Sequence, residues 1–139
     1  MFNFFNKENK KKIENPIIKV AALLIYAAKI DENYTQKERE LIKKAIIELG
    51  STNDMSDNIL LKAEEIEKKS HQILDFTKEI KNMDEDSKFK IIEILWNIVY
   101  SDNNPDMYEN NLMRRLTGLL YLNPKIVGDI KEKVKNKFK

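Results

Sequence analysis

Apolar residues recur at every third or fourth position along most of the chain, the spacing that buries one face of an α-helix. Such stripes occupy residues 16–30, 35–49, 54–69, 70–83, 86–100, 106–120 and 124–138. The stripe over residues 86–100 covers most of a helical circumference, so this helix is expected to be the most buried. We therefore predict an all-α protein, a single compact bundle of about seven helices.

Residues that cap helices stand at the boundaries of these stripes. An asparagine before a proline is typical of a helix start, as is a Thr or Asp three residues before a Glu, the capping box. A glycine after the last apolar residue is typical of a helix end. The predicted starts are Asn15-Pro16, Thr35 to Glu38, Ser70, Asp106 to Glu109 and Asn123-Pro124, and Gly50 marks an end. No linker interrupts residues 15–139, which we expect to form one domain after a tail of residues 1–14.

Part of the chain matches a later part at a constant offset of 71 residues. Residues 23–46 align with residues 94–117, and five pairs are identical: Leu24 and Leu95, Asp31 and Asp102, Asn33 and Asn104, Glu38 and Glu109, Leu41 and Leu112. The identities gather at the same corner between two helices. We interpret them as two copies of a helix–loop–helix unit, related by an approximate two-fold axis, with residues 54–83 packed between or beside them.

The composition excludes several classes of chemistry. The 139 residues include no cysteine and one histidine, which excludes disulfides, zinc–thiolate centres and cysteine nucleophiles. No glycine-rich phosphate loop and no Ser/His/Asp set stands out, so we expect no enzyme activity. The longest apolar run extends only from Val20 to Ala28, whereas a membrane-spanning helix needs about 20 residues. With no secretory leader in the sequence, the chain is expected to be cytoplasmic.

Charge and aromatic residues gather at the ends of the chain. The formal net charge is +2, but residues 1–15 and 123–139 are basic while the middle is acidic. Basic ends suit an anionic partner or simply solvate the chain, and no nucleic-acid partner is expected. Phe2, Phe4 and Phe5 precede the lysines of the tail. They are expected to dock on this domain, on a second copy in a homodimer, or on an anionic membrane as a peripheral contact.

The doubled corner resembles the TerB-like domains, a family named for tellurite resistance that also occurs in DjlA-type co-chaperones. Those domains end a helix with Ala-Asp-Gly, place a Glu seven residues after the Asp, and repeat the feature after an aromatic-rich helix. The matching residues here are Asp31 to Glu38 and Asp102 to Glu109, with Trp96 and Tyr100 as the aromatic part, although Glu32 and Asn103 replace the glycine. The resemblance covers about residues 16–134. It implies a non-enzymatic module that binds a protein partner in a bacterial stress response or a chaperone-linked pathway.

The acidic corners have two open interpretations. A carboxylate at the end of a helix faces the negative end of the helix dipole and needs a compensating contact. Backbone N–H groups of the following helix can supply it, which makes the corner structural. A hard cation, Ca²⁺ or Mg²⁺, can supply it too, because oxygen atoms are the ligands that such ions prefer. The metal ligands would then be Asp31, Asn33 and Glu38 in the first corner and Asp102, Asn104 and Glu109 in the second.

Two further sets of residues have a structural and a functional interpretation. Trp96 and Tyr100 are expected to be core residues. Lys43-Lys44 and Arg114-Arg115 stand at matching positions of the predicted repeat, on the polar faces of their helices. They either solvate those helices or form a basic surface for an anionic partner.

Overall fold

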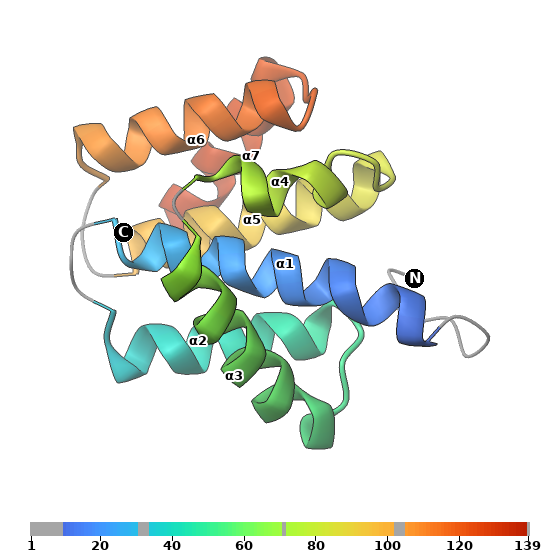
Figure 1. The fold of residues 1–139 in the computed structure, drawn as a ribbon. Helices are drawn as coiled ribbons and strands as arrows, with labels where there is room; N and C mark the ends of the chain where they lie inside the picture. Colours follow the sequence, from blue (N-terminus) through green and yellow to red (C-terminus); the bar gives the residue numbers. More distant parts are fainter. Residues whose placement is uncertain (1–9, 31–33, 71, 102–104, 139) are drawn as a thin grey trace.

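The computed structural model describes residues 10–30, 34–70, 72–101 and 105–138. These residues form seven helices and no strand, so the predicted all-α bundle is confirmed (Figure 1). The helices are α1 (Lys10–Ala28), α2 (Gln36–Glu48), α3 (Asn53–Lys69), α4 (Leu74–Ile80), α5 (Glu85–Tyr100), α6 (Met107–Leu119) and α7 (Pro124–Lys137). No helix among them is both long and apolar enough to cross a bilayer.

The helices gather around α1, which contacts α2, α3, α4 and α5. The second group forms on α5, which also contacts α7, while α7 in turn contacts α6. Figure 1 shows α2 and α6 at opposite sides of the bundle, with α1 and α5 between them. We call α1, α2 and α3 the N-terminal half, and α5, α6 and α7 the C-terminal half.

The centre of the bundle is shared between α1 and α5, whereas the sequence favoured the helix over residues 86–100 alone. Ten residues of α5 are buried. In α1, every residue from Ile17 to Ala28 is buried except Lys19 and Tyr26. The alanines of α1 are the reason, because small side chains let neighbouring helices approach from several directions. A hydrophobic stripe alone does not reveal this.

Two predicted helix starts are wrong. The first helix begins at Lys10, so Asn15 lies within it and Pro16 is an internal residue. Proline removes one backbone donor, but the lysines and glutamate before it are good helix formers that extend the helix past it. Ser70 ends α3, where its N–H donates to the carbonyls of Ile66 and Glu67, and it does not begin the next helix. The start of α4 has no side-chain cap.

The other predicted caps are confirmed. Thr35 and Asp106 form capping boxes at the starts of α2 and α6, and Asn123 caps α7 before a proline. Gly50 follows α2 with a φ of 120°, and Tyr121 follows α6 with a φ of 57°. At both ends the next two N–H groups donate back to the last turn of the helix, at distances of 3.0–3.1 Å. Glycine tolerates this left-handed backbone freely, while a tyrosine adopts it at a cost.

The bounds of the helices agree with the offset found in the sequence. Helix α6 has the bounds of α2 displaced by 71 residues (36 to 107, 48 to 119), and the N-caps of α3 and α7 are displaced in the same way (52 to 123). The two-fold relation between the halves stays a prediction. The predicted position of residues 54–83 is confirmed in that α3 and α4 both pack against α1.

Candidate functional site

The predicted metal ligands lie only partly within the residues that the structure describes. Asp31, Asn33, Asp102 and Asn104 fall outside them. Glu38 and Glu109 are described, and both belong to capping boxes. Within the described ranges, no group of three or more His, Cys, Asp or Glu residues is arranged to hold a metal ion. The metal site therefore stays a prediction.

Glu38 and Glu109 make the same local contacts at different depths. The Oε1 atom of Glu38 accepts hydrogen bonds from the N–H of Thr35 at 3.0 Å and from its hydroxyl at 3.2 Å. The Oε1 atom of Glu109 accepts one from the N–H of Asp106 at 3.1 Å. Glu38 is only 2% exposed, whereas Glu109 is half-buried. The structural role predicted for these glutamates is confirmed.

Ion pairs close the surface of the N-terminal half. Glu64 of α3 accepts hydrogen bonds from Arg39 Nε at 3.0 Å and from the Tyr34 hydroxyl at 2.9 Å. Lys29 pairs with Glu67 at 2.6 Å. Burial, together with the hydrogen bond to Glu64 and its charge, raises the pKa of Tyr34 well above its ordinary range. These contacts tie α2 and the end of α1 to α3.

A groove with lysines along its rim lies between α2, α5 and the end of α7, with a volume of about 320 Å³. Its floor is apolar and includes Leu41, Ile94 and Phe138. Its rim carries Lys37, Lys44 and Lys137, all exposed, and Glu48. Lys37 also donates to the carbonyl of Ser101 at 3.2 Å, and Glu48 pairs with Lys90 at 3.7 Å. We call this the lysine groove.

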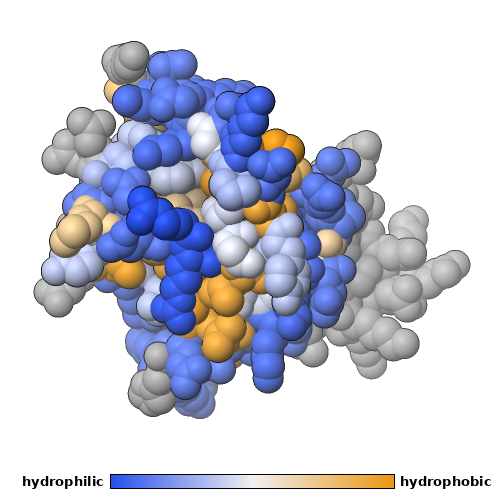
Figure 2. All heavy atoms as spheres, turned by 90° about the horizontal axis from the view of Figure 1, so that it is seen from above, coloured by the Kyte–Doolittle hydropathy of each residue, from blue (hydrophilic) through white to orange (hydrophobic). Residues whose placement is uncertain are grey.

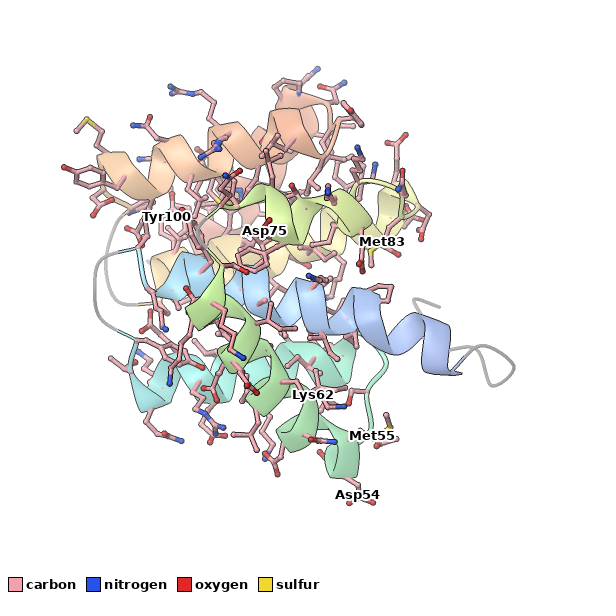
Figure 3. The ribbon with its side chains drawn as sticks, viewed as in Figure 1. Asp54, Met55, Lys62, Asp75, Met83 and Tyr100 are labelled. Atoms are coloured by element: carbon pink, nitrogen blue, oxygen red, sulfur yellow. The ribbon has the colours of Figure 1, made fainter. Side chains whose placement is uncertain are left out.

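The end of α7 is held against α5 by aromatic stacking. Tyr100, which Figure 3 labels at the end of α5, stacks on Phe138 with ring centroids 6.3 Å apart. Its ring also lies 5.9 Å from that of Trp96. Burial raises the pKa of Tyr100, with a smaller effect from Glu132. The predicted core position of both aromatic residues is confirmed, since Trp96 is 3% and Tyr100 6% exposed.

A second and larger hollow lies between α5, α6 and α7, with a volume of about 580 Å³. Trp96 lines it from α5, Arg114 and Gly118 from α6, and Gly128 and Lys131 from α7. Lys131 lies over the indole ring, its Nζ 5.1 Å from the centroid. We call this hollow the indole cleft.

The indole cleft contains an unsatisfied donor. Among the side chains that the structure describes, Trp96 Nε1 is the one buried nitrogen or oxygen atom without a hydrogen-bond partner. A buried donor left in this state costs about 1–3 kcal/mol. The cleft is also wider than packing requires, because a Cβ atom added at Gly118 or Gly128 would meet nothing within 4 Å.

Figure 2 shows the face seen from above, over α4 and α6, as mostly hydrophilic with a strip of apolar surface in its middle. Exposed apolar residues of these two helices include Leu74, Met107 and Tyr108. Single exposed apolar residues of this kind are ordinary on a protein surface. The two hollows therefore are the more specific features.

Comparison with known protein families identifies the fold. A family model described as tellurite resistance protein TerB matches residues 17–132, which is most of the chain. The chain belongs to the TerB family. The resemblance inferred from the acidic corners is thereby confirmed, and TerB domains are generally non-catalytic helical domains. Searches among curated proteins and among solved structures found no match.

The TerB match divides the two hollows differently. All residues that line the indole cleft, from Trp96 to Lys131, lie inside the matched range. Lys137 and Phe138 of the lysine groove lie beyond it. The end of α7 is therefore the part of this TerB-family chain where the groove depends on residues outside the family match.

Sequence reasoning missed both hollows. Arg114 and Lys44 were considered as basic surface residues, without any indication that each stands beside an apolar depression. One signal was available, because two of the three glycines lie within predicted helices, where glycine is unfavourable. A glycine kept within a helix often marks a place where space is needed.

Proposed function

We propose that this TerB-family chain is a non-enzymatic binding module, and that its lysine groove docks an acidic, amphipathic segment of a protein partner. The observation that carries the proposal is the combination of an apolar floor with three exposed lysines on its rim. The setting we propose is a stress response or a chaperone-linked pathway, as the tellurite-resistance description of the family suggests.

The chemistry of the groove supports a peptide segment with two kinds of side chain. Apolar side chains of the partner would cover the floor, where Phe138 is 48% exposed, and removing this area from water supplies most of the affinity. Carboxylates of the partner would face Lys37, Lys44 and Lys137. Such rim charges contribute more to the rate of association and to selectivity than to affinity.

Affinity capture with a matched control tests the proposal. The groove variant carries Lys37→Ser, Lys44→Ser and Lys137→Ser. The control variant carries Lys68→Ser, Lys78→Ser and Lys125→Ser, which change the net charge equally at exposed lysines away from the groove. We expect a partner captured from cells of the source organism to be retained by the control and lost by the groove variant. Capture of the same proteins by both variants would overturn the proposal.

The stress-response setting has its own test. Cells that lack the chain are complemented with the wild type, the groove variant or the control variant, and growth is measured with and without tellurite. We expect the wild type and the control to restore growth and the groove variant to fail. Equal growth of all strains on tellurite would remove tellurite resistance from the proposal, while leaving the capture result to decide on the groove.

The alternative proposal is a divalent-cation-binding protein that uses Asp31, Asn33 and Glu38 with Asp102, Asn104 and Glu109. It is supported by the burial of Glu38, because a carboxylate is rarely buried without strong compensation. Calorimetric titration with Ca²⁺, Mg²⁺ and Mn²⁺ tests it. Glu38→Gln keeps an oxygen for the capping box but loses the charge, so it should weaken ion binding with little effect on folding. An absence of binding heat from all three ions would overturn this alternative.

A further inference from the structure

We propose that the indole cleft binds a small organic anion, a carboxylate or phosphate attached to an apolar group, whose oxygen atoms accept hydrogen bonds from Trp96 Nε1 and Arg114. The inference concerns a different surface from the lysine groove and does not depend on it. Three observations carry it: the unsatisfied indole, the charge of the lining and the space that two glycines leave open.

The unsatisfied indole N–H calls for an acceptor. Trp96 is almost completely buried, and the structure gives its Nε1 no partner. An indole N–H can only donate, so its partner has to present an oxygen or another acceptor. Lys131 lies over the indole ring, and its hydrogen bond to Asn110 is long, at 3.4 Å. A flexible lysine in this position can turn toward an arriving anion and admit it to the indole.

The charge of the cleft selects an anion. Arg114 and Lys131 are the charged side chains of its lining, and none of the described residues that line it is acidic. Within the described ranges Arg114 forms no ion pair, whereas Lys43, 71 residues earlier, pairs with Asp57 at 3.0 Å. Gly128 stands 71 residues after Asp57 and provides no carboxylate. A guanidinium without a protein partner favours a carboxylate or a phosphate, which it binds through two parallel hydrogen bonds.

The space in the cleft fits a small molecule. Its volume of about 580 Å³ lies in the range of small-molecule sites, roughly 300–1,000 Å³. Neither Gly118 nor Gly128 is needed for helix packing, since a Cβ atom at either position would meet open space. Met113 and Val127, both buried, give the cleft an apolar wall. The apolar part of the ligand would lie along this wall with its charged end at Arg114.

The chain carries its own reporter for this site, because Trp96 is its one tryptophan. The probes are octanoate, octyl phosphate and the uncharged octanol, each added below its micelle-forming concentration while tryptophan fluorescence is recorded. We expect a saturable change with an anionic probe and none with octanol. A response to octanoate alone assigns a carboxylate, and a response to octyl phosphate alone assigns a phosphate. An equal response to octanol, or no response to any probe, would overturn the proposal.

Matched variants locate the binding. Arg114→Gln should weaken binding of the responding probe about tenfold, because it removes the charged donor. Arg115→Gln, an exposed neighbour that does not line the cleft, should leave the affinity unchanged. Equal weakening by both variants would overturn the assignment of Arg114.

Two further variants test the space and the donor. Gly128→Leu fills the cleft from an open position and should abolish binding while the chain stays folded, as judged by circular dichroism. Trp96→Phe removes the N–H and should weaken binding about fivefold when measured by calorimetry. Unchanged affinity in a folded Gly128→Leu variant would place the probe elsewhere and overturn the proposal.

Discussion

The two halves of the molecule place different side chains at positions 71 residues apart. The N-terminal half fills the space between its three helices with aliphatic residues, while the C-terminal half leaves a cleft there. Ile25, Ile42, Ile46 and Leu60 are fully buried, and the positions 71 residues later are Trp96, Met113, Thr117 and Lys131, which line the indole cleft. Arrangements with matching helix bounds can thus serve for packing in one half and for binding in the other.

A second pair of contacts differs in the same way. Lys29 and Glu67 form an ion pair in the N-terminal half. The residues 71 positions later, Tyr100 and Phe138, stack as aromatic rings. The same junction between two helices is therefore held by charge in one half and by apolar contact in the other. This teaches that the position of a contact can be retained while its chemistry changes.

The largest expected difference between the halves concerns Leu60 and Lys131. Leu60→Ala should lower the free energy of unfolding by about 2–5 kcal/mol, because it removes a fully buried side chain and leaves a cavity. Lys131→Ala loses only a contact with the Trp96 ring and should cost less than about 1 kcal/mol. Urea denaturation of both variants measures this. Equal losses would mean that the C-terminal half is packed as tightly as the N-terminal half.

The two capping boxes should differ next. Glu38→Ala leaves the N–H and hydroxyl of Thr35 without their acceptor in a buried setting, at an expected cost of about 1–3 kcal/mol. Glu109→Ala should cost less, because water can reach the half-buried N-terminus of α6. Thermal unfolding followed by circular dichroism compares them. A larger loss for Glu109→Ala would contradict the difference in burial.

The glycines of the C-terminal half should be replaceable at a gain. Gly118→Ala and Gly128→Ala should each raise the free energy of unfolding by about 0.5–1 kcal/mol, because alanine is the better helix former and its Cβ atom enters open space. Ala45→Gly, at a buried position of α2, serves as the reverse control and should destabilise. Destabilisation by both alanine variants would show that the cleft is already filled.

The smallest expected effect is the response of the N-terminal half to alkali. The folded state raises the pKa of Tyr34 above its ordinary value of 10.0, so it holds the proton more tightly than the unfolded state does. The stabilisation is fully present below pH 10 and is lost as the pH rises above it. Tyr34→Phe should flatten the pH dependence of the urea midpoint between pH 9 and 11. Tyr121→Phe, at an exposed site, is the control that should leave it unchanged.

Local capping could be predicted from the sequence because its partners lie within three residues of each other. Thr35 with Glu38 and Asp106 with Glu109 are contacts of this kind, and both are as predicted. The early start of α1 could not be predicted, because Pro16 is typical of a helix start and nothing local shows that the helix extends before it.

The candidate site was predictable only in its local part. The capping role of Glu38 follows from its spacing to Thr35, but its burial depends on how α2 packs in the bundle. The indole cleft combines residues of three helices that lie up to 35 positions apart (96 to 131). Its open space depends on the distances between those helices, which hydrophobic spacing alone does not set.

The position of α1 at the centre of the bundle has a consequence for synthesis on the ribosome. This helix is made early, yet one of the helices that it contacts, α5, is not complete until Tyr100 has been added. Helices α2 and α3 emerge first and can cover part of it, because domains form from the N-terminus as the chain grows. The surface of α1 that later meets α5 remains uncovered during that interval. We expect a nascent chain halted before α5 to need a chaperone, and one halted after Tyr100 to need it less.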